Sequence, residues 1–172
     1  MSSSGFDHQS LSAANINPIS FLATDYLNHF NEVVMLREMV ADMPDMIPDV
    51  MDWQPRDYIT HFERSVFAEK DLAIAAFKNA PSKPRERFEA VVAVLDDKIA
   101  DIQVLLAGVD VDKPLDPAVS DLLTNAILEE LRPGIDRASA IINAVDDPRT
   151  DAFEDHEMVT LRAQDAVDQL FA

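Results

Sequence analysis

The chain contains no cysteine, and only three of its 172 residues are glycine. The absence of cysteine excludes disulfide bonds, thiol nucleophiles and cysteine-ligated zinc or iron–sulfur centres. Hairpin turns and β-bulges depend on glycine, so its scarcity disfavours a strand-rich fold. An apolar share of 48% is nevertheless ample for a core, and a chain of this length buries about 70% of its unfolded surface. These features predict one compact helical domain.

Basic residues are also few. There are 14 lysines and arginines against 32 aspartates and glutamates, which gives a formal net charge of −18. Such a surface repels nucleic-acid phosphates and anionic lipid headgroups, so we expect neither nucleic acid nor a membrane as partner. No apolar run approaches the ~18 residues of a membrane span, and the N-terminal residues lack the basic and apolar regions of a signal peptide. We expect a cytoplasmic protein, and the excess of arginine over lysine is a hint of a bacterial source.

The polar, serine-rich residues 1–15 are predicted to be a disordered N-terminal arm, and residues 16–172 to form a single domain. A first long helix is predicted to begin at Asn17-Pro18, a cap followed by proline. From Ile19 to Met43 apolar residues recur at spacings of three and four, which indicates one buried helical face.

Similar periodicity predicts further helices after this one. The second, over residues 56–79, has Val66 among its inward positions, and the third covers residues 85–107. In the fourth, over 117–145, the sequence Arg132-Pro133-Gly134 is expected to kink or split the helix. A fifth is expected over 151–171. We therefore predict an all-α protein with more than 60% helix, folded as an antiparallel bundle of four long helices plus a fifth C-terminal helix.

The connection between the first two predicted helices is rich in methionine and holds the only tryptophan, Trp53. Methionine is flexible and polarisable, and therefore suits surfaces that accept varied apolar partners. Met46, Met51 and Trp53 are thus candidates for a docking patch that binds a protein partner or a second copy of the chain, with Trp53 as an exposed anchor. The alternative is a plug that closes the end of the bundle.

Two hexapeptides echo one another, DYLNHF from Asp25 and DYITHF from Asp57. Residues four apart share a helix face, so each aspartate is placed beside the histidine of its own motif. The interpretation we favour is structural. In it, the histidine supplies a hydrogen-bond partner to the buried tyrosine three residues before it, and the phenylalanine fills the core.

The same residues allow a divalent metal site. His29 and Glu32 lie one turn apart and could be completed by Glu69, which would suit iron, manganese or zinc. A simple hairpin centred near Asp49 offsets His29 and His61 by ~12 Å along the helices, so the two motifs are not expected to share one ion. The chain has neither the two Glu-X-X-His motifs of ferritin-like di-iron proteins nor the five histidines of hemerythrins.

The segment His61-Phe62-Glu63-Arg64-Ser65 resembles the phosphorylation motif of histidine phosphotransfer domains, which are four-helix bundles. It has the basic residue at +3 and the small residue at +4, and it departs from the pattern at Glu63, where an apolar residue is expected. The resemblance implies an exposed His61 that carries a phosphoryl group.

No short enzyme signature occurs in the chain. Our leading hypothesis is a non-catalytic interaction or regulatory module that binds a protein partner or a small apolar ligand. The alternatives are a metal-carboxylate bundle with redox or hydrolytic activity, and a phosphotransfer-like bundle using His61.

Overall fold

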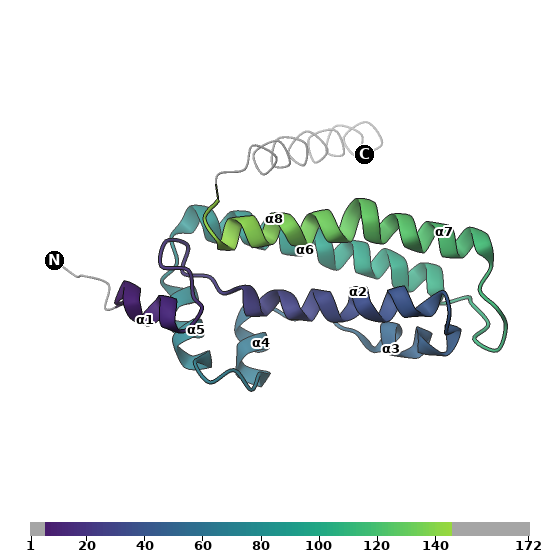
Figure 1. Ribbon diagram of the computed structural model, residues 1–172, viewed down its shortest axis with the longest axis horizontal. Helices are drawn as coiled ribbons and strands as arrows, with labels where there is room; N and C mark the ends of the chain where they lie inside the picture. Colours follow the sequence, from purple (N-terminus) through teal and green to yellow (C-terminus); the bar gives the residue numbers. More distant parts are fainter. Residues whose placement is uncertain (1–5, 146–172) are drawn as a thin grey trace, which may run out of the picture.

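The computed structural model describes residues 6–145 of the chain (Figure 1). Of these residues 71% are helical, and none of them forms a strand. The all-α prediction is therefore confirmed. Within this part of the chain no helix is both long and apolar enough to cross a membrane.

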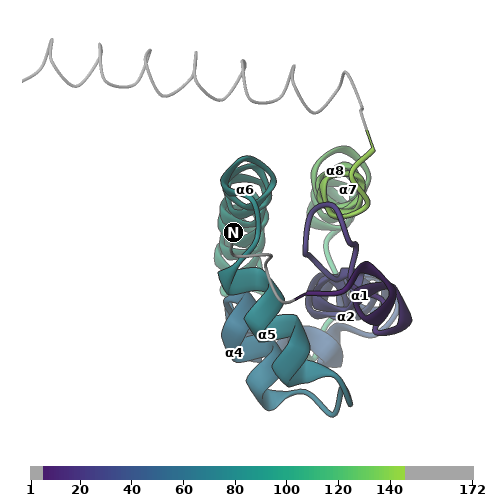
Figure 2. The ribbon, with the colours of Figure 1, turned by 90° about the vertical axis from the view of Figure 1, so that its left-hand side faces the viewer.

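Three helical rods lie side by side and form most of the body (Figures 1 and 2). They are α2 (Asn28–Val40), α6 (Ser82–Leu106) and a continuous rod of α7 (Pro117–Asn125), η3 (Ala126–Leu131) and α8 (Arg132–Ile142). The chain returns from α2 to α6 through three short helices, the last two of which occupy the range of the second long helix that we predicted over residues 56–79. After the 3-10 turn η2 (Pro44–Met46) these are α3 (Ile47–Asp52), α4 (Tyr58–Arg64) and α5 (Lys70–Lys78).

The N-terminal segment is ordered where it is described. Helix α1 spans His8–Ala13, and the Asp7 carboxylate accepts a hydrogen bond from the Gln9 amide at its start. Leu11 within it is completely buried. The prediction of a disordered arm is thus wrong for this helix, because the few apolar residues of a polar sequence, Leu11 and Ala14 among them, pack on the core.

The first long helix begins ten residues later than predicted. Asn17 does act as a cap, but its side chain accepts bonds from the amides of Ile19 and Ser20 and closes a turn. Phe21 then adopts a positive φ of 62°, which ends any helix there and leaves Ile19 exposed. Helical structure starts at η1 (Thr24–Leu27) and continues into α2.

The second predicted helix is interrupted at Ser65. Its hydroxyl donates to the Phe62 carbonyl at 3.0 Å and accepts from the Phe67 amide at 3.2 Å. These side-chain bonds replace backbone helix bonds and separate α4 from α5. Val66, which we had placed inward, is fully exposed in the resulting loop.

The third and fourth helices agree better with the prediction. Helix α6 matches the predicted range closely, and it buries Phe88 and Leu95 among other apolar residues. The fourth remains helical past Pro133, and the strain of the proline is absorbed by a π-helical turn, η3, just before it. The predicted fifth helix lies outside the described residues.

Candidate functional site

The two echoing hexapeptides come together in the core. The rings of Tyr26 and Tyr58 lie 5.3 Å apart between centroids, and those of His29 and His61 lie 6.3 Å apart. The predicted offset of ~12 Å is therefore wrong. That estimate assumed two unbroken helices in a hairpin, whereas α2 and α4 are linked by η2, α3 and an extended segment that carry α4 back to the start of α2.

The two tyrosines are anchored by the backbone, not by histidine. The Tyr26 hydroxyl donates to the Arg56 carbonyl at 2.6 Å, and the Tyr58 hydroxyl accepts from the Ala23 amide at 2.9 Å. Each hydroxyl thus bonds to the backbone one or two residues before the other hexapeptide. Both rings are buried, and burial raises the pKa of both phenols. The pair is a fixed, neutral aromatic wall.

His61 lies inside this cluster. Its side chain packs edge-on against Tyr26 and Phe62, and its Nε2 lies 3.2 Å from an Asp25 carboxylate oxygen. Only 9% of the residue is exposed. This is not the exposed imidazole that the phosphotransfer resemblance implies.

His29 is also buried, with 5% of its surface exposed. Its ring stacks on Trp53 with centroids 4.5 Å apart and 22° between the planes. Burial lowers the pKa of His29 to about 4, and the nearby charges of Arg56 and His61 act in the same direction. The imidazole is therefore neutral at physiological pH.

The residues predicted to hold a metal do not gather in the described structure. His29 is in the core, whereas Glu32 on α2 and Glu69 at the start of α5 are exposed. Among residues 6–145 no three histidine, aspartate or glutamate side chains are arranged to hold an ion.

The methionine-rich connection packs inward. Trp53 is only 7% exposed, and its indole donates to the His29 carbonyl at 3.0 Å. Met46 and Met51 are half-buried. The side chain of Gln103 on α6 donates to the Val50 and Trp53 carbonyls at 3.0 and 2.9 Å. The prediction of an exposed tryptophan anchor is wrong, and this geometry is that of the alternative, a plug.

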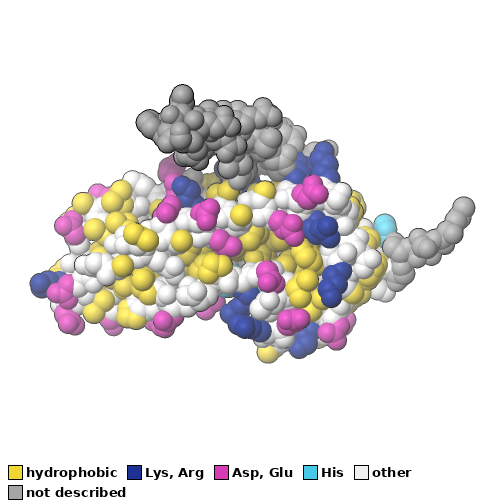
Figure 3. Space-filling view, turned by 180° about the vertical axis from the view of Figure 1, so that it is seen from behind, with side chains coloured by type: hydrophobic (Ala, Val, Ile, Leu, Met, Phe, Trp, Pro, Cys, Tyr) yellow, Lys and Arg dark blue, Asp and Glu magenta, His cyan; other side chains and the backbone are white. Residues whose placement is uncertain are grey.

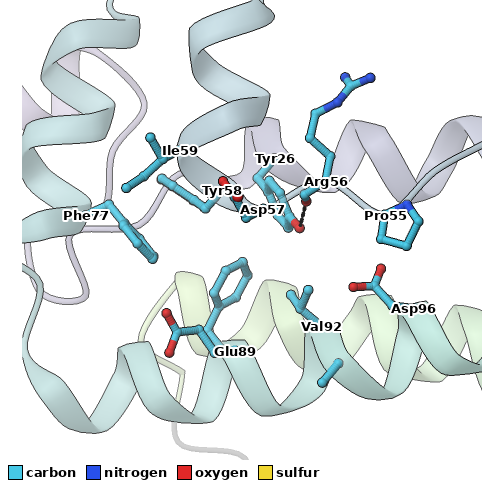
Figure 4. Close-up of a pocket in the computed structure, with 12 residues that line it drawn as sticks. Tyr26, Pro55, Arg56, Asp57, Tyr58, Ile59, Phe77, Glu89, Val92 and Asp96 are labelled. Atoms are coloured by element: carbon cyan, nitrogen blue, oxygen red, sulfur yellow. Dashed lines mark hydrogen bonds between the residues drawn. The ribbon is translucent and has the colours of Figure 1, made fainter.

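A pocket of about 430 Å³ opens beside the tyrosine pair, between α4, α5 and α6 (Figure 4). Most of its surface is apolar, and Tyr26, Tyr58, Phe77 and Phe88 contribute aromatic rings. The full lining is Tyr26, Pro55, Arg56, Asp57, Tyr58, Ile59, Phe77, Phe88, Glu89, Val92, Ala93 and Asp96. The reverse face of the molecule, seen in Figure 3, carries apolar side chains between scattered charged groups.

The charges around the pocket are unbalanced. Three carboxylates, those of Asp57, Glu89 and Asp96, line it together with one guanidinium, that of Arg56. Asp96 is half-buried on α6, and its carboxyl group faces Pro55 and the Tyr26 hydroxyl across the pocket (Figure 4). One of its oxygens, Oδ1, is buried without a hydrogen-bond partner.

This environment perturbs the ionisation of Asp96. Burial raises the pKa of its carboxyl group to about 6, and the charge of Asp97 acts in the same direction. Asp96 is therefore mostly ionised at neutral pH, but its charge is poorly solvated. A ligand group that donates hydrogen bonds or carries positive charge would stabilise the ionised carboxylate at this position.

The sequence contains one local signal for this pocket. Phe88, Val92 and Asp96 follow one another at intervals of four on a single helical row. A carboxylate at the end of an otherwise apolar row indicates either the edge of the core or a polar group inside a pocket. The aromatic wall opposite, by contrast, depends on the path of residues 47–57 and has no local signature.

Comparison of the chain with protein-family models, curated proteins and solved structures gives no match. Function is therefore inferred from the geometry of the pocket.

Proposed function

We propose that the protein is a non-catalytic binding module that takes a small apolar ligand into the pocket between the Tyr26–Tyr58 pair and α6. The observation that carries the proposal is a cavity of about 430 Å³ with aromatic walls and a mostly apolar surface. Small-molecule sites have volumes of roughly 300–1,000 Å³ and are lined mainly by apolar and aromatic side chains with a small number of placed polar groups.

The rigidity of the wall supports the same proposal. Tyr58 stacks on Phe77 with centroids 4.4 Å apart, and Phe88 meets both tyrosines edge-on at 5.5 and 5.9 Å. Because the tyrosine hydroxyls are bonded to backbone groups, the rings are held in place before any ligand arrives. A pre-formed site loses less conformational entropy on binding.

A second cavity, of about 470 Å³, lies between the N-terminal turn and the end of α8. Side chains with amide and hydroxyl groups dominate its lining, and those of Asn17 and Asn28 already bond to neighbouring residues. It offers a small ligand little apolar surface. The aromatic pocket is therefore the better candidate.

The experiment is a ligand-observed NMR titration with 2-(2-naphthyl)ethanol, a neutral aromatic alcohol. At about −0.3 kcal/mol per heavy atom, a ligand of this size binds with a dissociation constant in the millimolar range or below. The test variant is Ala93→Phe, because Ala93 is exposed at the pocket mouth and a phenyl ring there would cover it. We expect at least fivefold weaker binding.

The matched control is Ala100→Phe, the same change two turns further along α6, at an exposed position outside the pocket lining. It should bind like the wild type. Absence of binding by the wild type, or equal loss in both variants, would contradict the proposed function.

A further inference from the structure

We infer that the pocket selects an apolar amine, with the ammonium group of the ligand paired to Asp96 and its apolar body against the tyrosine pair. This inference rests on the proposed function, and it names the chemical class of the ligand. It depends on three features of the pocket, which are the unpaired carboxylate, the aromatic rings beside it and the excess of acidic groups around it.

The first feature is the missing partner of Asp96. Its Oδ1 atom is shielded from water and accepts no hydrogen bond from the protein. The neighbouring phenol of Tyr26 does not supply one, because its proton is donated to the Arg56 carbonyl. A buried acceptor without a donor is costly, and an ammonium group carries three N–H donors, one of which can bond to it.

The second feature is the aromatic lining next to this carboxylate. Tyr26 and Phe88 contribute rings to the same pocket, and they contact each other at 5.5 Å. The faces of aromatic rings carry partial negative charge and attract cations. The rings can therefore contact the apolar body of the ligand while its ammonium group bonds to Asp96.

The third feature is the balance of charge. On α6 the groups near Asp96 are Glu89 and Asp97, and on the segment before α4 they are Arg56 and Asp57. Arg56 is the single cation of the lining and is not among the charges that perturb Asp96. An anionic ligand would meet three carboxylates here. A cationic ligand is favoured, and the net charge of −18 concentrates cations near the surface.

The test compares 2-(2-naphthyl)ethylamine with 2-(2-naphthyl)ethanol by calorimetric titration at about 0.15 M salt, at which long-range attraction to surface charge is screened beyond ~8 Å. The two ligands have nearly the same shape and differ in charge. We expect the amine to bind wild-type protein at least tenfold more tightly, since a charge-assisted hydrogen bond contributes about that much.

Asp96→Asn should remove most of this preference, so that the amine and the alcohol bind this variant with affinities within about twofold of each other. The control is Asp101→Asn, an exposed acidic residue on α6 outside the pocket lining, which should keep the preference. Melting curves verify that both variants are folded.

Equal affinity of the wild type for the two ligands would overturn the amine inference and leave the apolar-ligand function standing. A loss of preference in Asp101→Asn as large as in Asp96→Asn would also overturn it, because the preference would then come from the overall charge. If neither ligand binds, the proposed function itself fails.

Discussion

At the scale of single residues, His29 and Asp96 have opposite effects on stability. Burial lowers the pKa of His29 from 6.5 to about 4. Between these two pH values the unfolded chain therefore binds more protons than the folded chain. The contribution of His29 to stability is complete above pH 6.5 and is lost as the pH falls. Burial raises the pKa of Asp96 from 3.8 to about 6. There the folded chain binds more protons, so stability decreases as the pH rises through this window.

Asp96→Asn should accordingly stabilise the protein above pH 6. The substitution removes a carboxylate that is poorly solvated in the folded state, and because Asp96 is only half-buried we expect a gain on the order of 1 kcal/mol at pH 7.5. At pH 4.5, where the folded carboxyl group is protonated, most of the difference should disappear. Urea unfolding at the two pH values measures it, and a destabilised variant at pH 7.5 would contradict our description of Asp96.

The stacked pair of His29 and Trp53 gives a spectroscopic prediction. Because the indole is buried, its emission should be blue-shifted and poorly quenched by acrylamide. A protonated imidazole in contact with the indole quenches its fluorescence, so the intensity should fall with a midpoint near pH 4, the pKa of His29. His29→Phe, which keeps a stacked ring, should abolish this transition. A midpoint near 6.5 would contradict the burial of His29.

At the scale of elements, the crossing of α6 and α8 depends on Gly134. A Cβ atom added at this position would lie 2.6 Å from Leu95 Cδ2, and Leu95 is itself buried. The two helices can therefore approach this closely only because the residue is glycine. The same rod contains the π-helical turn η3 before Pro133. In α7, just before this turn, the Leu123 carbonyl accepts a hydrogen bond from the buried Arg37 at 2.9 Å.

Gly134→Ala should destabilise the protein by about 1–2 kcal/mol, because the cost of overpacking exceeds the gain in helix propensity of roughly 1 kcal/mol. Gly108→Ala is the matched control. No atom lies within 4 Å of the added Cβ there, and Gly108 does not have a positive φ. Its effect should be neutral or slightly stabilising. Thermal melts measure the stability of both variants. Equal changes in melting temperature would show that the close approach of α6 and α8 does not require glycine at position 134.

Apolar periodicity predicted the helices well where packing determines their bounds. It predicted them poorly where side chains form hydrogen bonds with the backbone. Helix α6 follows its periodicity over nearly its whole length. The breaks at Asn17 and Ser65 arise from side-chain oxygens that compete for amides, and they interrupt patterns that look continuous. The meeting of Tyr26 with Tyr58 has a different cause, because η2, α3 and the extended segment bring α4 back to the start of α2. Apolar periodicity does not predict that path.

At the scale of the whole molecule, self-repulsion follows from a net charge of −18 on a compact body. Added salt screens this repulsion. We expect the melting temperature at pH 7 to rise between 0.02 and 0.5 M sodium chloride, and to rise less at pH 5, where part of the acidic charge is neutralised. A melting temperature independent of salt at pH 7 would mean that the charges are too well distributed to destabilise the fold.

We propose above that the aromatic pocket beside α6 binds small apolar molecules. The most direct measurement is a protein-observed NMR titration of isotope-labelled full-length chain with 2-(2-naphthyl)ethanol. We expect saturable shifts in the amides of residues 56–59, 77 and 88–96, which lie in or next to the pocket lining, with little change in α7. Shifts that concentrate at the polar cavity of Asn17 and Asn143, or no saturable shifts at all, would contradict it.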